Sequence, residues 1–89
     1  MRSVITVVGK DMVGILAKIS ASCADNSVNV IEVSQSILQD MFCMIMLVDV
    51  SECKVPFGDF AETLEKMGND MNLSVHAMHE DIFNSMHKI

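Results

Sequence analysis

The stretch "SVITVVGKDMVGIL", residues 3–16, decides the expected fold, because it joins a strand-like run to the start of a helix. Its first six residues are mostly apolar and β-branched, which is typical of a central strand. A short turn follows between Gly9 and Gly14, in which Asp11 stands where a helix N-cap is expected. The apolar residues beyond Asp11 recur at steps of three and four and predict a helical stripe: Met12, Ile15, Leu16, Ile19 and Cys23.

Three further strands and two further helices are expected along the chain. Residues 28–38 and 41–50 are predicted strands, joined by a two-residue turn at 39–40. Pro56 suits the first turn of a helix that ends near Gly68, and residues 72–79 alternate as a fourth strand. Residues 80–89 predict a short C-terminal helix with an apolar stripe: Ile82, Phe83, Met86 and Ile89. The order predicts an α+β fold, a ferredoxin-like βαββαβ plait with an antiparallel four-stranded sheet and two helices on one face, in one domain over residues 1–89.

Composition excludes several classes of protein. The net charge of −6, with a single arginine, predicts no nucleic-acid surface, because such surfaces need clustered cations. Three cysteines without a CxxC spacing fit reduced thiols in the cytoplasm rather than a disulfide framework. No signal peptide or membrane span is expected either.

The third predicted strand is apolar on both faces. One face carries Met41, Cys43, Ile45 and Leu47, and the other carries Phe42, Met44, Met46 and Val48. Two helices cover only one face of a sheet, and the tail helix is too short to cover the other. An exposed apolar surface of that size is typical of an interface, so we expect a homodimer or a larger assembly. The second strand, an edge in the plait, offers a second route to pairing.

The turn after the first strand has the chemistry of a small-molecule site. N–H groups at a helix start favour a carboxylate, and a glycine such as Gly14 allows close approach. Asp11 can pair with an ammonium group, so the combination suits an α-amino acid. The alternative is that Asp11 is only a cap and that Gly14 only helps the helix to pack.

The stretch "VVGKDMVGILAKISASCADNSVNVIEVSQ", residues 7–35, resembles the opening half of an ACT domain. The resemblance rests on Asp11, Gly14, Ile15, Leu16, Asn29 and Val30, and the element order extends it over the whole chain. Small free-standing ACT proteins and domains of the glycine cleavage system transcriptional repressor are the most similar members.

This resemblance implies an amino-acid ligand between two subunits. One wall would comprise Asp11, Met12, Val13, Gly14 and Ile15, and the opposite wall Asn29 of the other subunit. Some members that bind amino acids carry Asn at the Asp11 position, and many carry Pro at the Val13 position.

Other chemistries are less well supported. "MFCMIM", residues 41–46, contains soft ligands that suit Cu(I), and copper chaperones share the plait, but alternate strand residues point apart and favour core packing. His76 and His79 are expected on opposite faces of their strand, so no metal or other cofactor is predicted. No catalytic constellation stands out. The sequence predicts a module that senses a small metabolite and acts through self-association or a partner protein, with no nucleic acid or membrane involved. The alternative is an oligomerisation module that binds no ligand.

Overall fold

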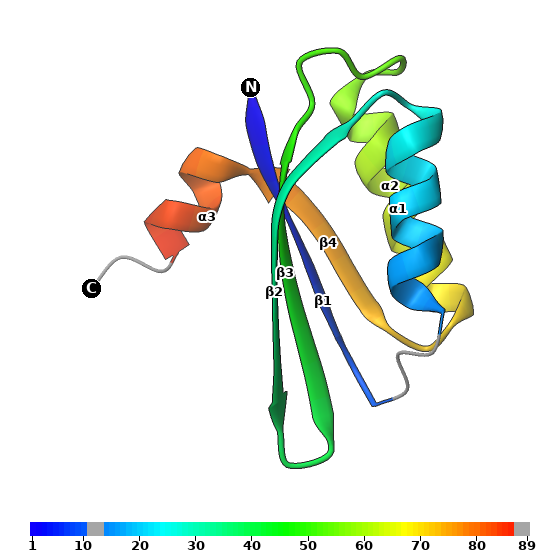
Figure 1. Cartoon of the computed structure of the whole chain (residues 1–89), viewed down its shortest axis with the longest axis vertical. Helices are drawn as coiled ribbons and strands as arrows, with labels where there is room; N and C mark the ends of the chain where they lie inside the picture. Colours follow the sequence, from blue (N-terminus) through cyan, green and yellow to red (C-terminus); the bar gives the residue numbers. More distant parts are fainter. Residues whose placement is uncertain (11–13, 87–89) are drawn as a thin grey trace.

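Four strands form one antiparallel sheet in the order β2-β3-β1-β4. The computed structural model describes residues 1–10 and 14–86. Its elements are β1 (Arg2–Gly9), α1 (Ile15–Asp25), β2 (Asn29–Leu38), β3 (Met41–Asp49), α2 (Phe57–Asp70), β4 (Ser74–His79) and α3 (Glu80–Met86). The two longer helices, α1 and α2, lie on one side of the sheet and α3 lies on the other (Figure 1). This arrangement confirms the predicted ferredoxin-like plait.

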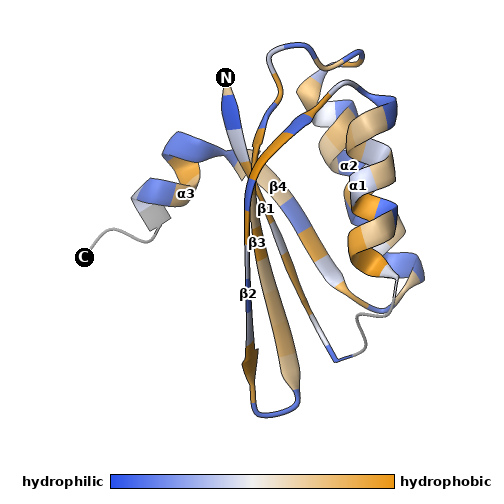
Figure 2. Ribbon diagram, viewed as in Figure 1, coloured by the Kyte–Doolittle hydropathy of each residue, from blue (hydrophilic) through white to orange (hydrophobic). Residues whose placement is uncertain are grey.

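The core lies between the sheet and the two longer helices. The central strands β1 and β3 supply Ile5, Val7, Met44, Met46 and Val48, all almost fully buried. Helices α1 and α2 cover them with Ile15, Ile19, Cys23, Phe60 and Leu64. Aliphatic and methionine side chains therefore fill the interior, and β3 is apolar over most of its length (Figure 2). Over the described residues, no helix is both long and apolar enough to cross a membrane.

β3 alternates between its two faces as predicted. Met44, Met46 and Val48 are buried under the helices, whereas Ile45, which points to the other face, keeps 41% of its surface exposed. That other face is partly open: α3 lies against it, and its Phe83 lines an apolar groove of about 360 Å³ over the sheet. Ile82, predicted to lie on the same apolar stripe, is 56% exposed. Residues 87–89, including the predicted Ile89, lie outside the described part of the chain.

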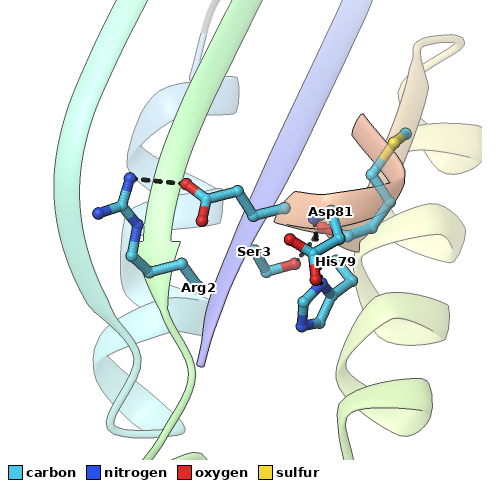
Figure 3. A network of polar contacts seen from close by, with 6 residues as sticks. Arg2, Ser3, His79 and Asp81 are labelled. Carbon is cyan, nitrogen blue, oxygen red and sulfur yellow. Dashed lines mark hydrogen bonds and ion pairs between the residues drawn. The ribbon is translucent and has the colours of Figure 1, made fainter. Parts of the chain in front are cut away.

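Polar contacts fix the start of α3 to the first strand (Figure 3). Arg2 forms an ion pair with Glu80, with 2.6 Å between Nη2 and Oε2. The Ser3 hydroxyl donates a hydrogen bond to the Met78 carbonyl, and the Asp81 N–H donates to Nδ1 of His79 over 3.1 Å. The Arg2–Glu80 ion pair thereby joins the two ends of the described chain on the open face, whereas Ser3, on the helix-covered face, connects β1 to β4.

Several predicted boundaries were wrong. Helix α1 begins at Ile15 with Gly14 at its N-cap. Its buried residues Ile15, Ile19 and Cys23 recur at steps of four, so Leu16 lies off that face and is 40% exposed. The predicted cap Asp11 lies outside the described residues, as does Met12. Helix α2 continues two residues past Gly68 to Asp70. β4 begins at residue 74, because residues 71–72 form a turn.

A glycine is required at position 68 of α2 because the helix packs closely on β4 there. A Cβ atom at Gly68 would lie 2.4 Å from Cγ2 of Val75 and 3.1 Å from the backbone oxygen of Leu73. Both residues are buried, so the neighbouring atoms have little room to shift.

We therefore expect Gly68→Ala to lower the free energy of unfolding by about 1–3 kcal/mol, the usual cost of overpacking a core. Urea unfolding followed by circular dichroism measures this. Gly58→Ala is the matched control, because a Cβ at this position of the same helix meets no atom within 4 Å. Equal stability of the two variants would contradict the packing role of Gly68.

Candidate functional site

The two glycines of the β1–α1 turn have different roles. Gly9 is buried at the end of β1, where a Cβ atom would lie 1.9 Å from Cδ2 of Leu73. Gly14 is exposed, and a Cβ there would meet nothing within 4 Å. Its φ of +80°, however, is in the left-handed region that side chains disfavour. Gly9 therefore provides room for the α2–β4 turn, and Gly14 provides the backbone conformation that starts α1.

The N-terminus of α1 suits an incoming anion. The N-cap glycine has no side chain to satisfy the first N–H groups, and the first turn of the helix contains no acidic residue. A helix N-terminus carries partial positive charge and favours carboxylates. The predicted site residues Gly14 and Ile15 lie at this helix start, whereas Asp11, Met12 and Val13 lie outside the described residues.

An open depression of about 470 Å³ adjoins this end of β1. Its polar groups come from Lys10, Asn72 and Ser74, and Lys10 Nζ also lies 3.6 Å from Asp40 Oδ2 at the β2–β3 turn. Val8, Gly9, Met41 and Met71 complete the lining. Its volume is within the range of small-molecule sites. The sequence did not predict the contribution of residues 71–74, because the fold brings the α2–β4 turn to this place.

Asn29, the predicted residue of the opposite wall, is exposed at the start of β2. It lines a smaller polar pocket of about 210 Å³ together with Ser27, Asp49, Ser51 and Glu52. The Ser51 side chain and backbone hydrogen-bond to Asp49 and lower the pKa of its carboxyl group. Asp49 is thus held as a carboxylate beside Asn29, a contribution that the sequence did not predict.

The two walls lie at opposite ends of the sheet in a single chain. Gly9 pairs with Phe42 of β3, whereas Asn29 pairs with Asp49 at the other end of the same strand. At about 3.3 Å per residue, the seven steps from residue 42 to residue 49 separate them by about 23 Å. One chain therefore does not bring the predicted site residues together.

Neither His76 nor His79 lines the two pockets described above. The pairing of Thr6 with His76 and of Ser3 with His79 places the two histidines on opposite faces of β4, as predicted. His76 lies 3.5 Å from Glu65, and His79 lies 3.6 Å from Asp81. Within residues 1–10 and 14–86, no group of three or more His, Cys, Asp or Glu residues could hold a metal ion.

Known proteins resemble the chain over nearly its whole length. The family described as the ACT domain matches residues 2–78. A UPF0237 protein of Methanocaldococcus jannaschii is 46% identical over 88 residues, which span 99% of this chain and 98% of that protein. An ACT domain protein from Streptococcus pneumoniae superimposes with a TM-score of 0.79 at 34% identity, covering 93% of each chain. A structure assigned to a glycine cleavage system transcriptional repressor gives 0.69 at 25% identity, covering 85% of this chain and 43% of that one. These matches confirm the predicted resemblance.

The turn geometry makes a specific prediction for Gly14. We expect Gly14→Ala to lower the free energy of unfolding by about 1 kcal/mol, because alanine disfavours a positive φ. Gly14→Asn should cost less, since asparagine visits the left-handed region more readily. Thermal and urea unfolding of both variants check this order. If both cost the same, the backbone conformation would not be what requires glycine.

Proposed function

The chain belongs to the ACT domain family, and we propose that it is a regulatory module that binds an α-amino acid between two copies of itself. Ligand binding then changes its self-association or its contact with a partner protein, and no catalytic step is involved. The observation that carries the proposal is the placement of the two predicted walls, Gly14–Ile15 and Asn29, at opposite ends of one chain. Only a second copy can complete such a site.

The edge strand β2 supports pairing between copies. All ten of its residues are exposed, and Glu32 is its only charged residue. Natural edge strands usually carry lysines, prolines or a covering segment that prevents pairing. β2 instead exposes five apolar side chains: Val30, Ile31, Val33, Ile37 and Leu38. An edge strand of this composition favours pairing with another strand over exposure to water.

Antiparallel pairing of two β2 strands would bring the walls together. About a two-fold axis, the first residue of one strand lies beside the last residue of the other. Asn29 of the partner subunit would then approach Leu38, at the end of the sheet that holds the β2–β3 turn. That turn is connected to the end of β1 through the 3.6 Å ion pair between Lys10 and Asp40. The partner's Asn29 and the start of α1 would thus share one end of the assembly.

The chemistry of these groups matches both ends of an amino acid. The N-terminus of α1 suits the carboxylate of the ligand. Asp11 can accept hydrogen bonds from the ammonium group, and the pocket beside Asn29 adds the ionised Asp49. The ligand-free oligomerisation module remains the alternative. It would use the same edge strand without any change on addition of amino acids.

Thermal unfolding with each common amino acid at millimolar concentration tests the proposal. A ligand that binds only the folded protein raises the melting temperature by mass action. For the ligand found, Asp11→Ala and Asn29→Ala should each weaken binding by about 1–3 kcal/mol, because each leaves a buried polar group of the ligand unpaired. Titration calorimetry measures this loss.

The matched control is Glu62→Gln, an exposed position in the middle of α2 that lines neither of the two described pockets, which should leave binding unchanged. Circular dichroism should show folded variants. An unfolded Asp11→Ala protein would instead identify Asp11 as a structural cap. If no amino acid shifts the melting temperature, the sensing role is wrong and the oligomerisation module is favoured.

The interface is tested by placing a charge on the edge. We expect Val33→Lys, near the middle of β2, to convert a wild-type dimer into monomer, since two copies would place like charges close to the axis. Light scattering behind size exclusion at micromolar concentration measures the mass. Ile82→Lys, an exposed apolar position on α3, is the control and should stay dimeric. A wild-type protein that is monomeric with and without amino acids would contradict the shared site.

A further inference from the structure

We propose that Cys23 and Cys53 are an oxidative modification site, which closes into an intramolecular disulfide when the protein meets a peroxide. Both cysteines are free thiols in this structure. They are distant in sequence but belong to segments that pack together at the end of the sheet where Asn29 lies. The inference does not depend on amino-acid binding.

The backbone holds the two segments against each other. Cys23 is 1% exposed on the core side of α1, in the last turn of the helix. Cys53 lies between β3 and α2, is half-buried, and packs against the core cluster that contains Cys23. The N–H of Lys54 donates a hydrogen bond of 3.0 Å to the carbonyl of Asn26, at the C-cap of α1. Lys54, which follows Cys53, is therefore hydrogen-bonded to Asn26, which lies three residues after Cys23.

The electrostatics agree with this proximity. Burial, with a smaller contribution from the charge on Cys53, raises the pKa of the Cys23 thiol to about 11. A thiolate at Cys53 thus disfavours ionisation of the Cys23 thiol. The buried thiol is protonated at neutral pH, whereas the half-buried Cys53 is the one that solvent reaches.

These properties give the two cysteines different roles in the oxidation. The Cys53 thiolate attacks a peroxide oxygen, the O–O bond breaks, and Cys53 becomes a sulfenic acid while hydroxide leaves and is protonated to water. The Cys23 thiolate then attacks that sulfur, the S–O bond breaks, and a second hydroxide leaves and is protonated to water. Two thiols and one hydrogen peroxide become one disulfide and two waters. Because thiolate is the attacking form, the second step should become faster as pH rises toward the pKa of Cys23.

Cys43 provides an internal control. It pairs with Val8 and lines the apolar groove on the face of the sheet opposite α1 and α2. The sheet therefore lies between Cys43 and the other two thiols. A disulfide between Cys23 and Cys53 would also restrain Ser51 and Glu52, which line the pocket beside Asn29.

The test treats the reduced, folded protein and its Cys43→Ser variant with one equivalent of hydrogen peroxide. We expect both to lose about 2 Da without forming dimers linked by disulfides. Cleavage before aspartate separates the three cysteines into residues 11–24, 40–48 and 49–58, so the map should show 11–24 joined to 49–58. The closed loop should raise the melting temperature by more than about 5 °C, reversed by a thiol reductant.

Two further variants separate the proposed roles. Cys53→Ser should form no disulfide, and Cys23→Ser should accumulate a sulfenic acid at Cys53 that dimedone traps. In the wild type, disulfide formation from this intermediate should accelerate about tenfold per pH unit between pH 7 and 9. Three free thiols after oxidation, a bond to Cys43, or sulfinic acid without a disulfide would overturn the proposal. If Cys23→Ser does not fold, the peptide maps of the wild type and of Cys43→Ser still show whether Cys23 and Cys53 are joined.

Discussion

The antiparallel register between β1 and β3 is the constraint on which the rest of the structure depends. It places Gly9 beside Phe42 and Arg2 beside Asp49, and so determines which groups meet at each end of the sheet. One end receives the start of α1, the β2–β3 turn and the α2–β4 turn. The other receives Asn29, Asp49 and the segment with Cys53. A slip of one residue would turn Ile5 and Val7 from the core to the open face, so the hydrophobic pattern itself fixes this division.

The division also explains why a chain of 89 residues needs a second copy for its proposed function. The sheet carries its two longer helices on one face, and the two pockets that adjoin the predicted walls lie at its opposite ends. Groups that would bind opposite ends of one ligand lie about 23 Å apart along β3. The proposed pairing of two edge strands would reverse one copy relative to the other and bring these groups to the same end without any change in the fold.

Much of the fold could be predicted because local patterns and packing agree. The alternation of β3, the turn at residues 39–40 and the start of α2 after Pro56 were all predictable from residue type and spacing. The errors fall where packing overrides a local signal. Gly68 was predicted to end a helix, but it lies inside α2, and a glycine stands there because Val75 leaves no room for a side chain. Leu16 matches the spacing of an apolar stripe, yet the face of α1 that packs on the sheet follows Ile15, Ile19 and Cys23 and leaves Leu16 exposed.

The candidate site was less predictable than the fold. Gly14 and Asn29 were predicted as site residues because their neighbours form a recognisable pattern, and their role in binding stays a prediction. Asp49, Asn72 and Ser74 could not, since each reaches its pocket only through strand register or through the position of a distant turn. Their sequence neighbours carry no sign of that role.

The attachment of α3 has a consequence for how the molecule opens. This seven-residue helix is the only described element on the far face, and a half-exposed ion pair from Arg2 is one of its main contacts with β1. Segments with few buried contacts open at a small fraction of the free energy needed for global unfolding. Amide hydrogens of α3 should therefore exchange with solvent long before those of β1 and β3. The groove that Phe83 lines has strands as its floor and α3 as one wall. If α3 opens before the strands do, the depth of the groove depends on that local opening.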